Sequence, residues 1–239
     1  MAAMGEPVFF ALSERNQREK NQDALYAARV EDYAVFGVAD GLGGHAHGEV
    51  AAAKAIAEIR EIAGGRIFTT RPSDLLSRAF EVANHRIASY NQELRVNSAT
   101  TLVAAIVHAR GKCTIANCGD SRAYVIGKDA FWHTRDHSFV QQLIQSGMLK
   151  EEDSFRHPHN NILTQALGLD RQAFPDIYER DVRGKVLILS TDGMHDFVRP
   201  ERIREIALHH EPAQAAELLV REAVAGGSTD NITLIVSRW

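Results

Sequence analysis

Four short apolar runs between residues 99 and 134 constrain the fold of this chain more than any other feature. The segments that join them are far shorter than the dozen or so residues that a parallel crossover connection requires. The runs therefore predict consecutive antiparallel strands rather than a parallel βαβ arrangement. They are ATTLVAAIVHA (99–109), KCTIANCG (112–119), SRAYVIG (121–127) and AFWHT (130–134).

Helical patterns interrupt these strands in blocks. Apolar residues recur at helical spacing over 48–63 and 73–94, and Ser73 is a plausible N-cap for the second of these helices. Such blocks predict antiparallel sheet layers covered by helices, which is a layered α+β architecture. The remaining predicted strands cover 7–12, 23–30, 33–39, 175–182, 185–191 and 231–238, and the remaining helices cover 137–146, 200–208 and 212–224.

Composition excludes several classes of protein. The 239 residues are 45% apolar with a net charge of -4, and without a basic stripe we expect no nucleic-acid partner. Cys113 and Cys118 would point to opposite faces of one strand, so we expect no disulfide. We find no signal peptide and no run long enough to span a membrane. We expect one domain over 1–239, without a regulatory extension, in a monomeric cytoplasmic protein.

Carboxylates follow or precede several of the apolar runs. The runs AVFGVADG and VLILSTDG end at Asp40-Gly41 and Asp192-Gly193, CTIANCGD ends at Asp120, and Asp230 precedes ITLIVS. Asp23 lies just ahead of another strand. Carboxylates that converge at strand ends, without thiolates, suit a hard divalent cation such as Mg²⁺ or Mn²⁺.

Each of these residues also has a plainer interpretation. Asp-Gly is common in turns, and for a single occurrence a turn is the better interpretation. Asp120 could cap a turn and pair with Arg122, Asp196 could begin a helix, and Arg18 could be a solvated surface residue. The glycine-rich loop DGLGGHAHG before the first helix offers backbone N–H groups to an anion, but it lacks the Lys-Ser/Thr of a P-loop.

Five motifs taken together resemble the metal-dependent protein Ser/Thr phosphatases of type 2C, the PPM family, in its bacterial form. They occur in the family's order and cover the chain from about Arg18 to Val236. The region DHSFVQQLIQSGML and the later HPHNNILTQALG resemble the bacterial flap, about 137–172. The five motifs are RxxNQDA (18–24), VADGLGGH (38–45), NCGDSRAY (117–124), STDGMHD (190–196) and STDNITLIV (228–236).

The resemblance implies a four-layer α-β-β-α sandwich, with two antiparallel sheets flanked by helix pairs, around a binuclear Mn²⁺ or Mg²⁺ centre. Asp40 would bridge the two ions and the Gly41 carbonyl would be a further ligand. Asp23, Asp192 and Asp230 would complete the set directly or through water. Asp120 and Asp196 match the positions of a third, weaker metal site, and Asn231 would support Asp230.

The implied reaction is hydrolysis of phospho-Ser/Thr monoesters by a metal-activated water. Arg18 would hold the substrate phosphate and His45 would be the general acid that protonates the leaving alkoxide. No Cys-(x)5-Arg loop is present, which argues against a cysteine-dependent phosphatase. The implied partners are phosphorylated proteins, with a cognate Ser/Thr kinase and its substrates a natural expectation.

Two alternatives stay open at this point: a pseudophosphatase that only binds phosphoproteins, and a hydrolase of small phosphate esters. The first is disfavoured because every expected ligand position keeps its carboxylate. Departures from the family pattern are small. Leu42 replaces a common methionine, and His195 stands beside the proposed metal site where an apolar residue is usual. His47, His157 and His159 are expected to be exposed.

Overall fold

The computed structural model describes residues 7–43, 47–65, 70–155, 157–169 and 173–239. Two antiparallel sheets form its centre. In spatial order, the first sheet contains β1 (Val8–Glu14), β11 (Ile232–Arg238), β10 (Val186–Ser190), β7 (Arg122–Gly127) and β8 (Ala130–His133). The second contains β2 (Asp23–Val30), β3 (Tyr33–Leu42), β5 (Leu102–His108), β6 (Lys112–Cys118) and β9 (Asp176–Asp181), with β4 (Ala99–Thr100) paired to β3.

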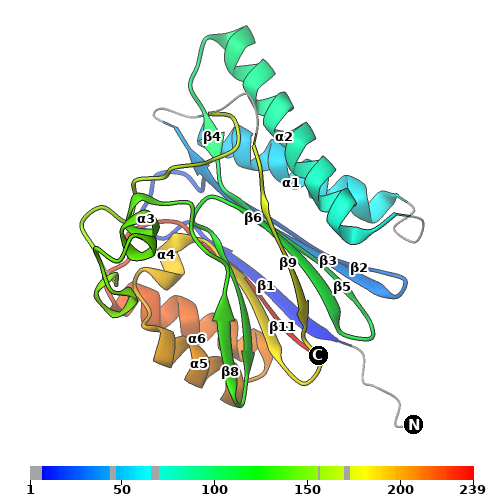
Figure 1. Cartoon of the computed structure of the whole chain (residues 1–239), viewed down its shortest axis with the longest axis vertical. Helices are drawn as coiled ribbons and strands as arrows, with labels where there is room; N and C mark the ends of the chain where they lie inside the picture. Colours follow the sequence, from blue (N-terminus) through cyan, green and yellow to red (C-terminus); the bar gives the residue numbers. More distant parts are fainter. Residues whose placement is uncertain (1–6, 44–46, 66–69, 156, 170–172) are drawn as a thin grey trace.

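Helix pairs cover the outer faces of the two sheets (Figure 1). The first pair lies on the six-stranded sheet and comprises α1 (Gly48–Gly64) and α2 (Pro72–Leu94). The second pair lies on the five-stranded sheet and comprises α5 (Pro200–His209) and α6 (Pro212–Ala225). The layers therefore run α-β-β-α, as the family resemblance implies.

Three apolar clusters follow from this layering. One fills the space between the two sheets, and each of the others lies between a sheet and its helices. Cys113 packs between the sheets while Cys118 packs under the first helix pair, which confirms that the two thiols point to opposite faces of β6. The strict alternation of a strand explains why an odd separation sends them apart.

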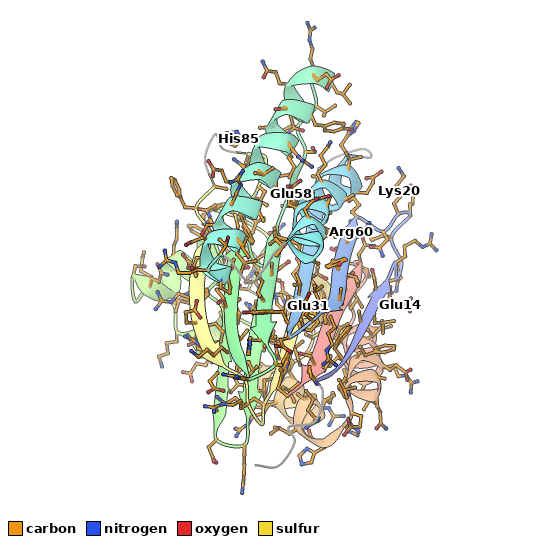
Figure 2. All side chains as sticks on the ribbon, turned by 90° about the vertical axis from the view of Figure 1, so that its right-hand side faces the viewer. Glu14, Lys20, Glu31, Glu58, Arg60 and His85 are labelled. Atoms are coloured by element: carbon orange, nitrogen blue, oxygen red, sulfur yellow. The ribbon has the colours of Figure 1, made fainter. Side chains whose placement is uncertain are left out.

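The first helix pair also carries polar contacts on its inner side. Figure 2 shows Glu58 where α1 faces α2, and Arg86 of α2 forms an ion pair with it. The guanidinium of Arg60, on the same helix, stacks over the Tyr26 ring of β2 with its central carbon 5.6 Å from the ring centroid. These contacts fix α1 against both of its neighbours.

In the described part of the chain, no helix combines the length and apolarity needed to cross a bilayer.

Two local expectations are wrong. The helix expected from Ser73 begins at Pro72, with Arg71 as the N-cap residue, because proline is well suited to the first helical position. The single strand expected over 99–109 is two strands, β4 and β5, because the backbone leaves the ladder at Thr101. There the Thr101 N–H donates to the Asp40 carbonyl at 2.9 Å instead of continuing the strand pairing.

The segment between β8 and β9 leaves the sheets and lies beside the end of the sandwich (Figure 1). It contains the short helix α3 (Phe139–Gln145) and a 3-10 turn, η2 (Glu151–Asp153). Two isolated bridges tie it back to the body, Ser138 to Leu163 and Thr100 to Leu167. This is the region expected to be the flap.

Candidate metal centre

The two sheets meet at the ends of strands that carry acidic residues. Asp23 begins β2 and lies directly opposite Asp40 of β3 in the ladder register. Asp192 follows β10 in the other sheet and begins the short helix α4 (Asp192–His195). Asp230 lies just before β11, which is the neighbour of β10. Sheet topology therefore brings together residues that are far apart in the sequence.

The electrostatics show that these carboxylates face one another. Burial raises the pKa of Asp40 well above its usual range, and the charges of Asp192, Asp23, Asp120 and Asp230 raise it further. Such mutual repulsion requires that the groups share one region of low polarity. We call the six aspartates of this region the carboxylate centre: Asp23, Asp40, Asp120, Asp192, Asp196 and Asp230.

The pKa values of Asp192, Asp23 and Asp120 are raised as well. Burial, followed by the charges of Asp196 and Asp230, raises the pKa of Asp192 to about 7. Burial raises the pKa of Asp23 to about 6, although hydrogen bonds from threonines oppose the shift. Burial and the charge of Asp192 raise the pKa of Asp120 well above its ordinary value. A cation bound among these carboxylates would therefore relieve their mutual repulsion.

Both Asp-Gly dipeptides require glycine, because another backbone segment packs closely against this residue. A Cβ on Gly41 would lie 2.3 Å from the Gly48 carbonyl oxygen and 2.6 Å from that of Gln22. A Cβ on Gly193 would lie 2.0 Å from the carbonyl oxygen of Asn231. Only glycine fits such distances, and the second contact is what places Asp192 beside Asp230.

Threonine side chains hold the centre together across the sheets. Thr191, at the end of β10, donates its hydroxyl proton to Asp23 Oδ2 of the other sheet at 3.0 Å. The same hydroxyl accepts the backbone N–H of Thr233 at 3.0 Å. On the opposite side, Thr101 Oγ1 accepts the Asp40 N–H at 3.0 Å and Thr100 Oγ1 donates to the Asp40 carbonyl at 2.8 Å.

Arg18 lies in the loop between β1 and β2, which we call the arginine loop (residues 15–22). Its guanidinium donates to Asp230 Oδ2 at 2.7 Å, with 56% of its side chain exposed. It therefore lies at the edge of the carboxylate centre, where an incoming anion could reach it. Arg15, in the same loop, donates to the Glu19 carbonyl at 3.1 Å.

Asn231 fastens the arginine loop to the carboxylate centre. Its buried side-chain amide donates to the carbonyl oxygens of Arg15 at 2.9 Å and Lys20 at 3.0 Å. Its side-chain oxygen accepts the Gln22 N–H at 2.8 Å. Its own backbone N–H donates to Asp230 Oδ1 at 2.7 Å. One side chain thus positions both ends of the loop that carries Arg18 and leads into Asp23.

Asp120 and Asp196 lie on the flap side of the centre. Asp120 is buried, and the turn before it is held by His137, whose N–H donates to the Gly119 carbonyl at 2.9 Å. His137 Nδ1 also accepts the Gly119 N–H at 3.3 Å. Asp196 follows α4 as its C-cap, so it does not begin a helix. Burial raises its pKa, and Arg122 and a hydrogen bond from Asn160 of the flap oppose that shift.

Several plainer interpretations are wrong on geometry. Arg122 pairs with Asp136 through two N–H···O bonds of 2.8 Å and 2.6 Å rather than with Asp120. His47 is not an exposed loop residue, because its Nδ1 lies 2.8 Å from the Tyr90 hydroxyl of α2. His157 is half-buried, while His159 is exposed as expected. His45, the expected general acid, lies outside the described residues.

The donor set fits a hard, partly hydrated cation. Within the described residues, no three His, Cys, Asp or Glu side chains are grouped closely enough to hold a metal ion by themselves. An ion here would therefore combine carboxylate oxygens with backbone carbonyls and water, and retained water is typical of Mg²⁺. The raised pKa values of Asp23, Asp40 and Asp192 are the observation that favours such a cation.

Sequence reasoning overlooked Thr191, Thr101 and His137. The only available signal was their position, because each lies within two residues of a strand end or a carboxylate. Which partners they bind depends on strands that become neighbours only in the folded sheets.

Comparison with known proteins agrees with this geometry. The model of the protein phosphatase 2C family matches residues 12–221. The serine/threonine protein phosphatase PstP of Mycobacterium tuberculosis is 31% identical over 227 residues, which cover 92% of this chain but 42% of PstP. The chain thus spans less than half the length of that relative.

Solved structures extend the similarity to three dimensions. The structure of serine/threonine phosphatase Stp1 from Staphylococcus aureus is 30% identical with a TM-score of 0.89, covering 99% of this chain and 96% of that one. The catalytic domain of PstP, in complex with two manganese ions, is 29% identical with a TM-score of 0.86, covering 98% of each chain. The chain therefore belongs to the protein phosphatase 2C family of metal-dependent phosphatases.

Proposed function

We propose that this protein is a Ser/Thr protein phosphatase that hydrolyses phosphoserine and phosphothreonine monoesters with two Mn²⁺ or Mg²⁺ ions. The observation that carries the proposal is the carboxylate centre, where burial and neighbouring aspartates raise the pKa of Asp40 and Asp192 beside an accessible arginine. The similarity to the manganese complex of PstP supports the choice of metal. Phosphorylated proteins, including a cognate Ser/Thr kinase and its substrates, are the proposed partners.

Asp40, Asp23, Asp192 and Asp230 would hold the two ions, with the carbonyl of Gly41 as a further ligand. Asp120 and Asp196 would hold a third ion more weakly, because Arg122 already offsets part of the charge around Asp196. When bound, the ions supply Lewis-acid stabilisation of phosphoryl oxygens and lower the pKa of a coordinated water.

The chain's own residues would bind and orient the substrate. Arg18 can present two N–H groups to phosphate oxygens, which is the geometry that guanidinium groups favour with such anions. Asn231 keeps the arginine loop at a fixed distance from Asp230. His45 would donate a proton to the serine or threonine oxygen as the ester bond breaks, because an alkoxide is a poor leaving group.

The test is phosphate release from a phosphothreonine peptide by the full chain, with Mn²⁺ and then with a chelator. We expect turnover only with Mn²⁺. Free phosphothreonine tested alongside separates a protein phosphatase from a hydrolase of small esters. Folded protein that binds Mn²⁺ but releases no phosphate from the peptide would refute the proposal.

A further inference from the structure

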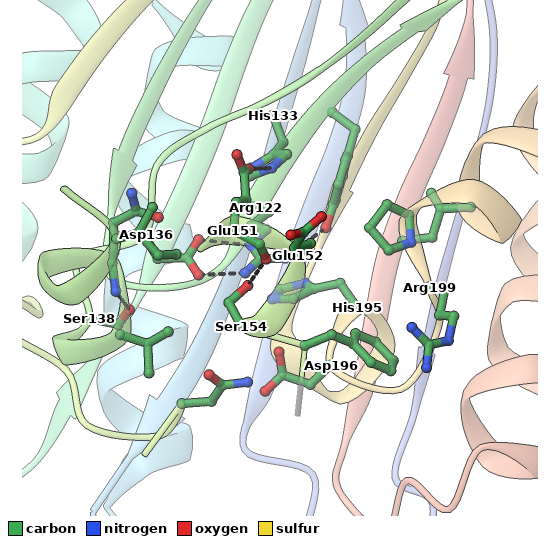
Figure 3. Close-up of a pocket in the computed structure, with 18 of the residues that line it drawn as sticks. Arg122, His133, Asp136, Ser138, Glu151, Glu152, Ser154, His195, Asp196 and Arg199 are labelled. Carbon is green, nitrogen blue, oxygen red and sulfur yellow. Dashed lines mark hydrogen bonds and ion pairs between the residues drawn. The ribbon is translucent and has the colours of Figure 1, made fainter. Parts of the chain in front are cut away.

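A cavity of about 240 Å³ lies beside the carboxylate centre, between the flap and the start of α5 (Figure 3). We call it the flap recess. Asp196 lines it, and so do Arg122, His133, Glu151, His195 and Arg199. Because Asp196 belongs also to the carboxylate centre, a group bound in the recess would lie next to a substrate phosphate held by Arg18. A second cavity adjoins the recess, sharing His133, Glu151 and Glu201, and extends it toward Lys150 and Trp132.

The recess has an excess of negative charge. Of its two arginines, Arg122 is neutralised by Asp136 through the two hydrogen bonds already described. Arg199 makes no ion pair within the described chain, and its guanidinium lies 4.7 Å from the Phe155 ring centroid. Against it stand Glu151 and Glu201 at the rim and Asp196 inside. A third rim carboxylate, Glu152, already forms an ion pair with Lys150 at 3.4 Å.

Two hydrogen-bond acceptors face each other at this rim. His133 Nδ1 lies 2.7 Å from the Thr134 carbonyl oxygen, and since a carbonyl cannot donate, this nitrogen carries the ring proton. Burial and the charge of Arg122 lower the pKa of His133, which favours the neutral ring. Its Nε2 then offers a lone pair toward Glu151 Oε1, only 3.5 Å away. Two acceptors at this separation are suited to sharing N–H donors.

A buried imidazole also lines the recess without a full set of partners. The side chain of His195 is 3% exposed, and its Nδ1 lies 3.1 Å from the Ser190 hydroxyl. Its Nε2 makes no hydrogen bond to any residue in the described part of the chain.

We propose that the flap recess binds a basic side chain, arginine or lysine, that flanks the phosphorylated residue of a protein substrate. A guanidinium or ammonium group brings N–H donors to Glu151 and to the neutral His133, and balances the rim carboxylates. The rings of Tyr124 and Phe155 line the same cavity and suit the apolar stem of such a side chain. The inference rests on the proposed function, since it assigns the recess to the substrate of that reaction.

The test compares phosphothreonine peptides that carry arginine or glutamine at one flanking position, two to four residues to either side. For at least one position we expect the arginine peptide to have a KM about fivefold lower than the glutamine peptide, the size expected for partly exposed ion pairs. Equal values at every position in the parent protein would overturn the proposal.

Two double variants locate the effect. Glu151→Gln with Glu201→Gln removes two rim carboxylates, and Glu205→Gln with Glu217→Gln makes the same change of net charge outside the recess. We expect the ratio of the two KM values to fall to about one in the rim variant and to persist in the control. Loss of the ratio in both would point to long-range charge, and persistence in both would remove the recess from recognition. Either result contradicts the proposal.

The ratio is taken within each variant, so it does not depend on a variant's total activity, and thermal unfolding checks that each is folded. Failure of the proposed function has a different signature, because none of the peptides would then be hydrolysed. Hydrolysis of all peptides at one rate would leave the phosphatase assignment intact and overturn only the recess.

Discussion

The two Asp-Gly dipeptides of this protein share a sequence but not a local structure. Asp40-Gly41 stays within a strand, since β3 continues to Leu42 and Gly41 pairs with Thr100. Asp192-Gly193 instead turns out of β10 into the short helix α4. What they share is a backbone packed against the glycine at a distance that no side chain tolerates. The dipeptide therefore marks a place where two backbone segments pack closely, and this packing positions the carboxylate.

Their surroundings differ as well. Asp40 lies in the middle of the carboxylate centre, and four other aspartates raise its pKa. Asp192 lies nearer the flap side, where Asp196 is its strongest charged neighbour. The difference predicts that Asp40 would contact both ions while Asp192 would contact one.

The largest effect on activity is expected from removing the negative charge of Asp40 or of Asp192. Asp40→Asn and Asp192→Asn should each lower turnover of a phosphothreonine peptide about a thousandfold or more, since a metal ion supplies several kcal/mol of stabilisation. Calorimetry with Mn²⁺ should separate them: Asp40→Asn should weaken both binding events, and Asp192→Asn mainly one. Unchanged Mn²⁺ binding in Asp40→Asn would remove that residue from the metal centre.

The same charges make the metal-free protein sensitive to pH. The pKa of Asp23 is raised to about 6 and that of Asp192 to about 7, so between about pH 4 and pH 7 the folded chain holds protons that the unfolded chain has lost. With chelator present, stability should therefore fall as pH rises through this window. The slope is at most about 1.4 kcal/mol per pH unit for each group. Asp192→Asn should flatten the slope, and melting temperatures measured from pH 4 to 8 would reveal it.

The glycines come next in expected effect. Gly193→Ala and Gly41→Ala should each lower the free energy of unfolding by about 3 kcal/mol, because the new methyl group overlaps backbone oxygens that cannot move independently. Gly64→Ala is the matched control, since nothing lies within 4 Å of its added Cβ and alanine favours a helix by about 0.5–1 kcal/mol. Urea unfolding measures all three. A loss at Gly64 equal to the others would mean that close approach is not the cause.

The arginine loop provides a smaller and more selective effect. Asn231→Ala leaves three backbone groups without their partner and should destabilise the protein by about 1–3 kcal/mol. Because the loop positions Arg18, KM should rise more than kcat falls. Asn16→Ala in the same loop removes one bond, to the Ser228 carbonyl, and should change KM less. Equal effects on KM would show that Asn231 has no special role in positioning Arg18.

Sequence patterns predicted the strands, the layers and the acidic residues of the centre, because strand periodicity and Asp-Gly are local signals. They did not predict the break at Thr101, where a tertiary hydrogen bond to Asp40 overrides an apolar run that would otherwise continue. They also left open a pairing of Arg122 with its sequence neighbour Asp120, whereas in the folded chain Asp136, beyond the next hairpin strand, is its partner. Side-chain partners across two sheets depend on which strands become neighbours, and that information is not local.

The smallest expected effect tests how the surroundings of the two Asp-Gly dipeptides are connected. Thr191→Val removes the hydroxyl that links Asp23 of one sheet to Thr233 of the other, and Thr101→Val removes the acceptor of the Asp40 N–H. Each should lower the free energy of unfolding by about 1–2 kcal/mol.

Thr191→Val should also weaken Mn²⁺ binding by about tenfold, since hydrogen bonds to ligating carboxylates orient them. Thr101 Oγ1 bonds to the backbone N–H of Asp40 and to the Ser121 hydroxyl, not to a carboxylate, so Thr101→Val should affect stability more than metal affinity. Equal losses of Mn²⁺ affinity in both variants would mean that the backbone around Asp40 and the carboxylate of Asp23 are positioned as one unit. The contrast between the two Asp-Gly dipeptides would then not extend to metal binding.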